Sequence, residues 1–225
     1  MYLKKSIDFG LNLLLPNDLQ CAACERYRNL VKWQLCEDCL DCLEPVDFEL
    51  SADQYGLERL VSCFYYNQFA KKMIYRHKAE HHRYYSKIFA NMIQERLRRA
   101  DIKIDGITWI PTAADRIARR GCDHAKDIAR ALAEQMAVPT IPLLEYSRRH
   151  GTQKRLSREN RIENMIDAFI CRRPVSEGLS ILIIDDVVTT GATIKSAAEA
   201  ILKRNTGCHL FAATVFYTPP KNSED

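Results

Sequence analysis

Hydrophobic and polar positions along the chain predict strands that alternate with helices. Short apolar runs, rich in β-branched and aromatic side chains, predict strands at residues 60–66, 107–110, 181–184 and 210–216. Apolar side chains at helical spacing predict helices at residues 86–99, 125–136 and 194–202. This alternation favours an α/β fold in which right-handed crossovers join the strands of a parallel sheet.

Length and composition limit the class of protein. The 225 residues suffice for one substantial domain and a small appendage, and 47% hydrophobic residues exclude a wholly disordered chain. A net charge of +4 does not by itself indicate a nucleic-acid partner. No apolar window approaches the roughly eighteen residues of a membrane span, so a cytoplasmic protein is expected.

The N-terminal residues resemble a signal peptide only at first sight. Lys4 and Lys5 precede a short apolar run at residues 9–15. However, Asp8 lies beside that run, and no small-residue cleavage site follows it. We therefore expect a short helix that packs onto the body of the protein.

Two Cys-x-x-Cys pairs stand out among the nine cysteines. Cys21 and Cys24 form the first pair, and Cys36 and Cys39 form the second. Each pair can place two thiolates on one metal ion, so together they predict a tetrahedral structural Zn²⁺ site. A redox-active pair is the alternative, but it needs no second pair. Because Cys39 and Cys42 have the same spacing, the pattern alone leaves the second pair open.

Two carboxylates and a polar turn follow the apolar run at residues 181–184. Asp185 and Asp186 stand where that strand should end, and residues 189–193 form a small turn before a helix. The N–H groups at a helix N-terminus favour a phosphate, and adjacent carboxylates can accept hydrogen bonds from vicinal ribose hydroxyls. The side chains of neighbouring residues diverge, which suits ribose binding better than a shared proton. The segment predicts a ribose 5-phosphate pocket.

The same segment resembles the motif by which type I phosphoribosyltransferases bind 5-phosphoribosyl 1-diphosphate (PRPP). The resemblance covers residues 181–193, and an ordinary strand-to-helix crossover with polar turn residues is the alternative. The resemblance implies PRPP-binding roles for Asp185, Asp186, Val187, Val188, Thr189, Thr190, Gly191, Ala192 and Thr193.

The chain carries its cysteine pairs at residues 21–39 and its PRPP motif at residues 181–193. This combination makes it similar to the ComF family, the competence-associated phosphoribosyltransferase-domain proteins. Residues 110–121 are similar to the family's VPVP…RGFNQ stretch, except that Cys122, Asp123 and His124 replace Phe-Asn-Gln. Residues 152–169 match its TQ…R..N…AF segment. The resemblance implies a type I phosphoribosyltransferase fold, a parallel sheet flanked by helices, in residues 51–225.

The family resemblance also assigns the smaller parts. It implies a helix and a four-cysteine zinc finger in residues 1–50, and it selects Cys36 and Cys39 over Cys42. It further implies that Pro111, Thr112 and Ala113 form the diphosphate loop, with Mg²⁺ accompanying PRPP. No residue plainly activates an acceptor nucleophile, so no catalytic residue is assigned.

Residues 148–161 form a strongly basic segment. Their six basic residues against one acidic residue give a local charge of +5, more than the +4 of the whole chain. We interpret the segment as a hood that covers phosphates of PRPP or of a DNA backbone, and a solvated basic loop is the alternative. The residues assigned to this flexible, nucleic-acid-binding role are Arg119, Arg120, Arg148, Arg149, Lys154, Arg155, Arg158 and Arg161.

Three histidines resemble a metal cluster but are interpreted otherwise. His77 and His81 share a helical face, and His82 follows. The flanking Lys78 and Arg83 would repel a cation, so this pattern predicts a basic surface.

Two functions remain. The family resemblance implies a cytoplasmic DNA-uptake factor of natural transformation that binds single-stranded DNA and PRPP, with the competence DNA-translocation helicase as a further partner. The alternative is an active phosphoribosyltransferase acting on a nucleobase or a base-like acceptor. Diphosphate release from PRPP across a panel of bases would separate the two.

Overall fold

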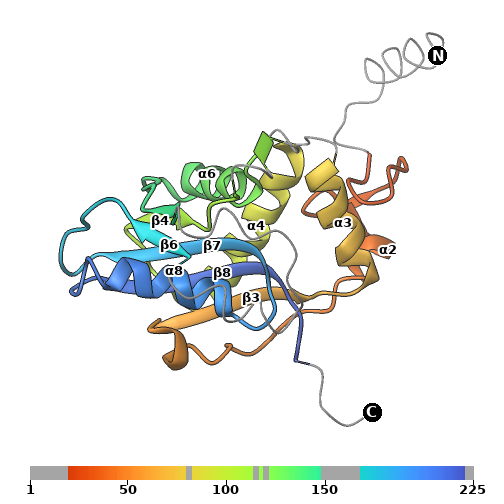
Figure 1. The fold of residues 1–225 in the computed structure, drawn as a ribbon. Helices are drawn as coiled ribbons and strands as arrows, with labels where there is room; N and C mark the ends of the chain where they lie inside the picture. Colours follow the sequence, from red (N-terminus) through yellow and green to blue (C-terminus); the bar gives the residue numbers. More distant parts are fainter. Residues whose placement is uncertain (1–19, 80–82, 114–116, 119–121, 148–167, 221–225) are drawn as a thin grey trace. The chain divides into compact units, whose positions relative to one another are not determined.

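The computed structural model describes residues 20–79, 83–113, 117–118, 122–147 and 168–220 (Figure 1). The chain divides into two compact units, the first ending at Glu44 and the second beginning at Pro45. The helix predicted within the first eighteen residues lies outside the described residues. Within the described ranges, none of the helices combines the length and apolar character that crossing a membrane requires.

The first unit is a small hairpin followed by a helical turn. Strand β1 (Leu30–Lys32) pairs antiparallel with β2 (Leu35–Cys36), and α2 (Glu37–Leu40) follows directly. Trp33 and Gln34 join the strands with φ angles of 49° and 57°, as a tight hairpin turn requires. Much of what this unit buries is cysteine rather than aliphatic side chain, so it has little hydrophobic core of its own.

The second unit is built on a four-stranded sheet whose neighbouring strands are all parallel. The strands follow the spatial order β3 (Arg59–Tyr65), β8 (His209–Tyr217), β7 (Ser180–Val188) and β4 (Gly106–Trp109). Residues 181–184 are at most 1% exposed in the middle of β7, as expected for a central parallel strand. The predicted parallel α/β sheet is confirmed.

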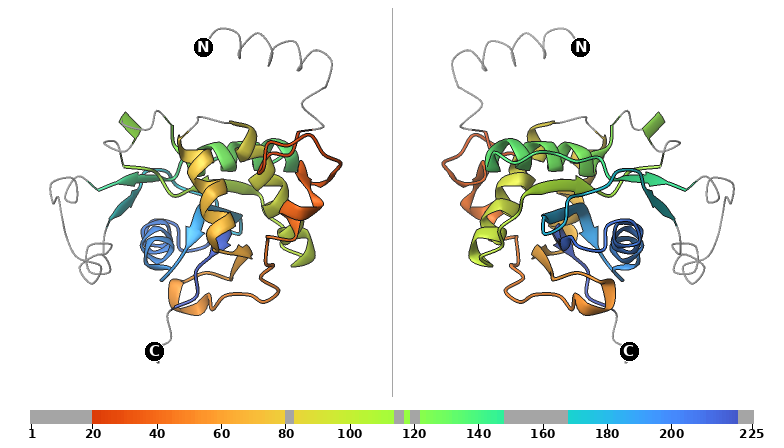
Figure 2. Two further views of the ribbon diagram at one scale, coloured as in Figure 1. Left: turned by 90° about the vertical axis from the view of Figure 1, so that its right-hand side faces the viewer. Right: turned by 90° about the vertical axis from the view of Figure 1, so that its left-hand side faces the viewer.

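Helices cover both faces of this sheet (Figure 2). Helices α4 (Arg83–Arg99) and α6 (His124–Met136) pack on one face, and α8 (Ala192–Leu202) packs on the other. All three lie where apolar spacing predicted a helix. The apolar positions predicted to face the core in α4 are at most 1% exposed: Ile88, Phe89, Met92, Ile93 and Leu97.

Several elements were not predicted from the sequence. Helix α3 (Gln68–Ala79) buries Ala70, Met73, Ile74 and His77, a helical spacing whose last member is polar. The short strands β5 (Leu144–Tyr146) and β6 (Phe169–Cys171) pair antiparallel, and η2 (Asp53–Tyr55) is a single 3₁₀ turn.

Two boundaries differ from the sequence-based expectation. Strand β7 continues four residues past 184, because its ladder with β8 extends to the pair Val188 and Tyr217. Asp185 and Asp186 therefore lie inside this strand rather than after it.

The second difference is the boundary between the two units. Residues 45–50 were assigned to the N-terminal domain, but Pro45 and Leu50 pair with Phe64 and Leu60 of β3.

Candidate functional site

The carboxyl ends of the parallel strands bring the predicted ribose and diphosphate segments to one edge of the sheet. Strands β4 and β7 are neighbours, with Trp109 opposite Ile184. Residues 111–113 therefore leave the sheet beside Asp185, Asp186 and the turn that follows β7. Ligands of parallel α/β sheets bind outside this edge.

The two aspartates are partly buried and interact with each other. The backbone N–H of Asp186 donates to Oδ1 of Asp185 at 2.8 Å. Burial, and then the neighbouring Asp186 carboxylate, raise the pKa of Asp185 well above its ordinary value. The pair therefore resists carrying two negative charges, and hydrogen-bond donors such as ribose hydroxyls would relieve it.

A lysine missed by the sequence analysis completes this pair. Nζ of Lys78, on α3, forms an ion pair with Oδ2 of Asp186, and the two side chains are 28% and 14% exposed. The sequence analysis considered Lys78 only as a neighbour of histidines. No local pattern could have indicated a contact between residues so far apart in the chain.

The turn at residues 189–191 leads into α8. Gly191 occupies the N-cap position of this helix with φ 74°, a conformation that favours glycine. The N–H of Ala192 donates to Oγ1 of Thr190 at 3.4 Å, and Thr189 and Thr190 are exposed. The exposed turn at the start of an eleven-residue helix suits a phosphate group.

Tyr55 holds this turn from the protein side. Its hydroxyl donates to the backbone oxygen of Thr190 at 3.1 Å. A Cβ atom added at Gly191 would lie 2.5 Å from the Tyr55 ring. The family resemblance implies a PRPP-binding role for this glycine, and in the structure the group that approaches it closely is Tyr55.

The loop after β4 is held by the residue that precedes α6. Asp123 occupies the N-cap position of this helix, but its side chain makes no capping hydrogen bond. Instead, its carboxylate accepts from Oγ1 of Thr112 at 2.9 Å and from the Thr112 N–H at 3.3 Å. Asp123 thus holds the predicted diphosphate loop in place through Thr112, and it does not cap the helix with its side chain.

His77 is part of the core, so the interpretation of it as a basic surface is wrong. It is 2% exposed, and its Nε2 lies 3.0 Å from Oγ of Ser86. Burial, and then the neighbouring His124, lower the pKa of His77 to about 3, so its ring is neutral at pH 7. His81 and His82 lie outside the described residues.

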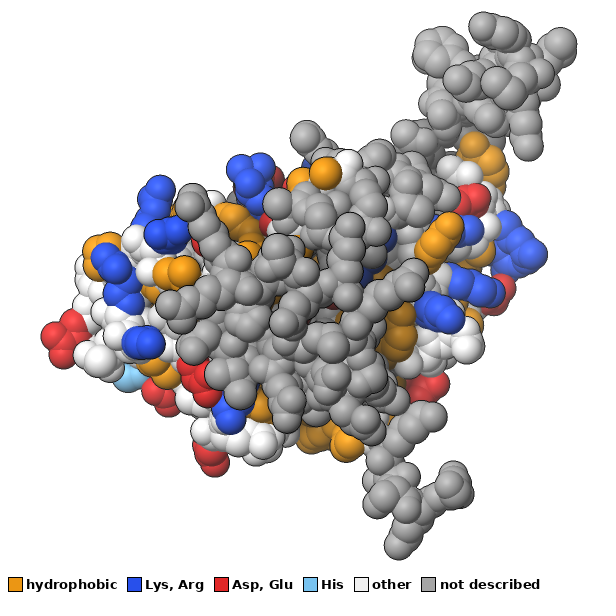
Figure 3. Space-filling view, viewed as in Figure 1, with side chains coloured by type: hydrophobic (Ala, Val, Ile, Leu, Met, Phe, Trp, Pro, Cys, Tyr) orange, Lys and Arg blue, Asp and Glu red, His pale blue; other side chains and the backbone are white. Residues whose placement is uncertain are grey.

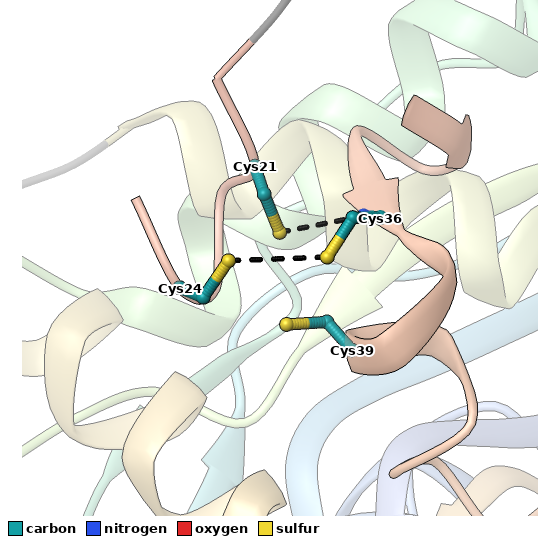
Figure 4. A group of neighbouring side chains, drawn as sticks. All are labelled: Cys21, Cys24, Cys36 and Cys39. Atoms are coloured by element: carbon teal, nitrogen blue, oxygen red, sulfur yellow. Dashed lines mark hydrogen bonds between the residues drawn. The ribbon is translucent and has the colours of Figure 1, made fainter. Parts of the chain in front are cut away.

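The four cysteines of the two predicted pairs converge on one point (Figure 4). Their sulfur atoms all lie within 4.8 Å of one another, and Cys24 Sγ is 3.8 Å from Cys36 Sγ. Four sulfurs at about 2.3 Å from a tetrahedral Zn²⁺ stand about 3.8 Å apart, so the geometry fits this metal. Cys42 lies outside the group, is exposed, and directs its Sγ to the Asp38 carbonyl at 3.2 Å.

The thiols of this cluster differ in how readily they ionise. Burial opposes ionisation of Cys21, but the N–H groups of Cys24, Cys36 and Ala23 outweigh it and lower the pKa of Cys21 to about 7. Burial raises the pKa of both Cys36 and Cys39. A bound dication would provide the charge that four thiolates require.

The basic residues assigned to phosphate or nucleic-acid binding fall outside the described residues: Arg119, Arg120, Arg148, Arg149, Lys154, Arg155, Arg158 and Arg161. The flanking Ser147 and Ala168 lie together, with the Ser147 N–H donating to the Ala168 carbonyl at 2.8 Å. On the face drawn in Figure 3, the described Lys and Arg side chains occur in several places, with Asp and Glu among them. The described residues on that face form no single basic patch.

Comparisons with known proteins identify relatives of this chain. A family model described as a phosphoribosyl transferase domain matches residues 117–225. The chain is 30% identical to the competence protein ComFC of Streptococcus pneumoniae over 88% of its own length and 89% of that protein. It is 33% identical to the DNA utilization protein YhgH of Salmonella typhi over 44% of each chain.

Among solved structures, the chain is similar to Leishmania donovani UMP synthase. The two are 20% identical with a TM-score of 0.37, and the match covers 78% of this chain and 29% of that one. This likeness is too distant to bear on function.

Replacement of Asp185 by asparagine should stabilise the protein at neutral pH. A carboxyl group with a raised pKa contributes stability that is fully present below its unfolded-state pKa and is lost as pH rises through the folded-state value. Asn keeps the acceptor for the Asp186 N–H but carries no charge. We expect Asp185→Asn to raise Tm at pH 7 by roughly 2–4 °C, a difference that shrinks as pH falls toward about 4.

Asp186→Asn is the matched control, because it breaks the ion pair with Lys78 and should lower Tm. Thermal unfolding of the two variants and the wild type between pH 4 and pH 8 measures both effects. An equal loss of Tm in both variants would contradict the proposed electrostatic difference between the two carboxylates.

Proposed function

Because the chain belongs to the ComF family, we propose that it is a cytoplasmic DNA-uptake factor of natural transformation that binds PRPP and single-stranded DNA. One observation supports PRPP as the ligand: the acidic pair, the turn at the start of α8 and the Thr112 loop lie at one edge of the parallel sheet. The names of the relatives, a competence protein and a DNA utilization protein, support the DNA role.

In this proposal each part of the edge binds one part of PRPP. Asp185 and Asp186 accept hydrogen bonds from the ribose hydroxyls, and residues 189–193 bind the 5-phosphate through backbone N–H groups. Residues 111–113 face the diphosphate.

Mg²⁺ fits this arrangement, since it is commonly held by one or two carboxylates together with substrate phosphates. When bound, it would neutralise diphosphate charge. The chain's own contribution is to orient the ribose and to place N–H donors around both phosphate ends.

The cysteine cluster is proposed to bind one structural Zn²⁺ through Cys21, Cys24, Cys36 and Cys39. The sulfur distances support this assignment, and so does the small amount of aliphatic core in the first unit. In so small a unit, metal binding would provide a large part of the free energy of folding.

The DNA-binding part of the proposal rests on residues 148–161 and their charge of +5. A segment of this charge neutralises phosphates, so binding should depend on salt and only weakly on base sequence. The competence DNA-translocation helicase is the further protein partner proposed with this role.

An active phosphoribosyltransferase is the second candidate, favoured by the family match over residues 117–225. The reaction would transfer the phosphoribosyl group from PRPP to a nucleobase or a base-like acceptor and release diphosphate. No described residue is assigned to activate an acceptor, which is why this function stands second.

Removal of both carboxylates should abolish most PRPP binding. The double variant Asp185→Ala with Asp186→Ala loses the carboxyl acceptors of both ribose hydroxyls, which should cost about 2 kcal/mol or more, roughly 30-fold in Kd. Isothermal titration with PRPP and Mg²⁺ measures the change. Glu177→Ala removes an exposed carboxylate before β7 and should leave the affinity unaltered. Unchanged affinity in the double variant would refute the ribose assignment.

Zinc content should distinguish the cluster from Cys42. Elemental analysis should find about one zinc per wild-type chain, and Cys36→Ser should lose it because a tetrahedral site needs all four ligands. Cys42→Ser should keep the metal, since Cys42 lies outside the cluster. A folded wild type without metal, or loss of zinc in Cys42→Ser alone, would overturn the assignment.

Single-stranded DNA binding should weaken steeply with salt and depend on the basic segment. Alanine at Arg148, Arg149, Lys154 and Arg155 should reduce the slope of log K against log salt by about 0.7 for each phosphate that the variant no longer neutralises. Fluorescence anisotropy with a labelled oligonucleotide measures this slope.

The matched control removes four exposed cations elsewhere: Arg172, Arg173, Lys203 and Arg204. It should change the slope much less. A wild type that does not bind at about 50 mM salt, where such contacts are strong, would contradict the DNA-uptake role. Diphosphate release from PRPP with a panel of bases then tests the second candidate function, an active phosphoribosyltransferase.

A further inference from the structure

Two contacts fix the opposite sides of the proposed PRPP site, and both come from residues that the sequence analysis did not assign to the site. On the ribose side, Lys78 of α3 is paired with Asp186. On the diphosphate side, Asp123, which precedes α6, holds Thr112. The first contact comes from α3 and the second from the residue that precedes α6, so the packing of α3 against α6 acts on the spacing of the site together with the β4–β7 ladder.

They are joined by a pair of buried histidines, each next in sequence to one of these contacts. His77 precedes Lys78 and is 2% exposed, and His124 follows Asp123 and is 3% exposed. Their ring centroids lie 4.8 Å apart, with an angle of 59° between the rings. The packed rings therefore form a direct connection between the ribose side and the diphosphate side.

The surroundings of His77 hold its ring in place. Phe89 of α4 packs edge-on against it, with ring centroids 5.2 Å apart and an interplanar angle of 88°. Its Nε2 lies 3.0 Å from Oγ of Ser86, and its buried Nδ1 has no hydrogen-bond partner among the described residues. The His77 ring is thus held more by packing against other rings than by hydrogen bonds, so a flat neighbouring ring is needed to keep its position.

We propose that the packed His77 and His124 rings are a brace that sets the distance between the ribose carboxylates and the diphosphate loop. Both histidines are then positioning residues, and they favour a ligand that reaches both sides, PRPP, over one that reaches only the ribose side, ribose 5-phosphate. This inference rests on the PRPP site proposed above. Its physical basis is that two subsites bind one ligand tightly only when their separation lets both engage it at once.

A purely structural role predicts a different result. Loss of core packing lowers Tm and affects both ligands alike. Loss of the brace changes the ratio of the two dissociation constants, because ribose 5-phosphate makes no contact with the Thr112 loop.

The test measures dissociation constants of PRPP and ribose 5-phosphate by isothermal titration, with Mg²⁺, well below the Tm of each variant. His124→Ala should weaken PRPP about tenfold or more and ribose 5-phosphate less than about twofold. His124→Phe keeps a ring against His77 and should restore the wild-type ratio. If His124→Ala does not fold, His124→Leu replaces it, since leucine fills space without a flat ring.

Two further variants separate packing from position. Leu97→Ala removes buried packing from α4, eight residues beyond Phe89, and α4 carries neither contact to the site, so it should lower Tm and leave the ratio unchanged. Lys78→Met acts on the ribose side and should weaken both ligands alike.

Equal losses for the two ligands in His124→Ala, or an unchanged PRPP affinity, overturn the brace while the proposed site stands. A wild type that binds neither sugar phosphate overturns the proposed function and the brace with it.

Discussion

The hydrogen-bond ladder between β7 and β8 continues past the two aspartates, and the site depends on this extension. Asp185 lies opposite Thr214, and the pairing extends to Val188 and Tyr217. Carboxylates in a loop could turn toward water, but a central strand covered on both faces keeps them partly buried. The charge of Asp186 then needs a counterion, which Lys78 supplies from α3, and Asp185 ionises with difficulty. The sheet thus holds two carboxylates close together in a partly buried position, and a ligand rich in hydrogen-bond donors would relieve their repulsion.

The two units obtain their stability in different ways. In the second unit, apolar side chains from α4, α6 and α8 cover a sheet whose strand β7 is at most 1% exposed over residues 181–184. In the first unit, the turn at residues 21–24, β2 and α2 bring four sulfur atoms together where a larger domain would place aliphatic side chains. We therefore expect removal of metal to affect the first unit and the integrity of the sheet to be independent of it.

Local patterns predicted the elements that have strong local signals. The apolar run before Asp185 indicated a central strand, and the spacing of Phe89, Met92 and Ile93 indicated α4, because burial imposes these periods directly. The Cys-x-x-Cys spacing likewise indicated the cysteine cluster. Strands β5 and β6 were missed because three residues are too few to establish a period.

The contacts that shape the site were harder to predict. Helix α3 was missed because its buried face ends in His77, a polar residue that is usually assigned to the surface. Asp123 has the sequence position of a helix cap, yet its carboxylate hydrogen-bonds to Thr112, a residue in a different loop. Lys78 and Asp186 meet only after the chain has folded, so no window of sequence contains their interaction.

The hydrogen bond between Ser147 and Ala168 has a consequence for how this family can vary. Because β5 and β6 pair with each other and the Ser147 N–H donates to the Ala168 carbonyl, the fold fixes the two points between which residues 148–167 run. Connecting two fixed points becomes only slowly more costly as the chain between them grows, by about 0.6 kcal/mol for each doubling of its length. A change in the number of residues between Ser147 and Ala168 would therefore leave the pairing of β5 with β6 in place and cost the fold little.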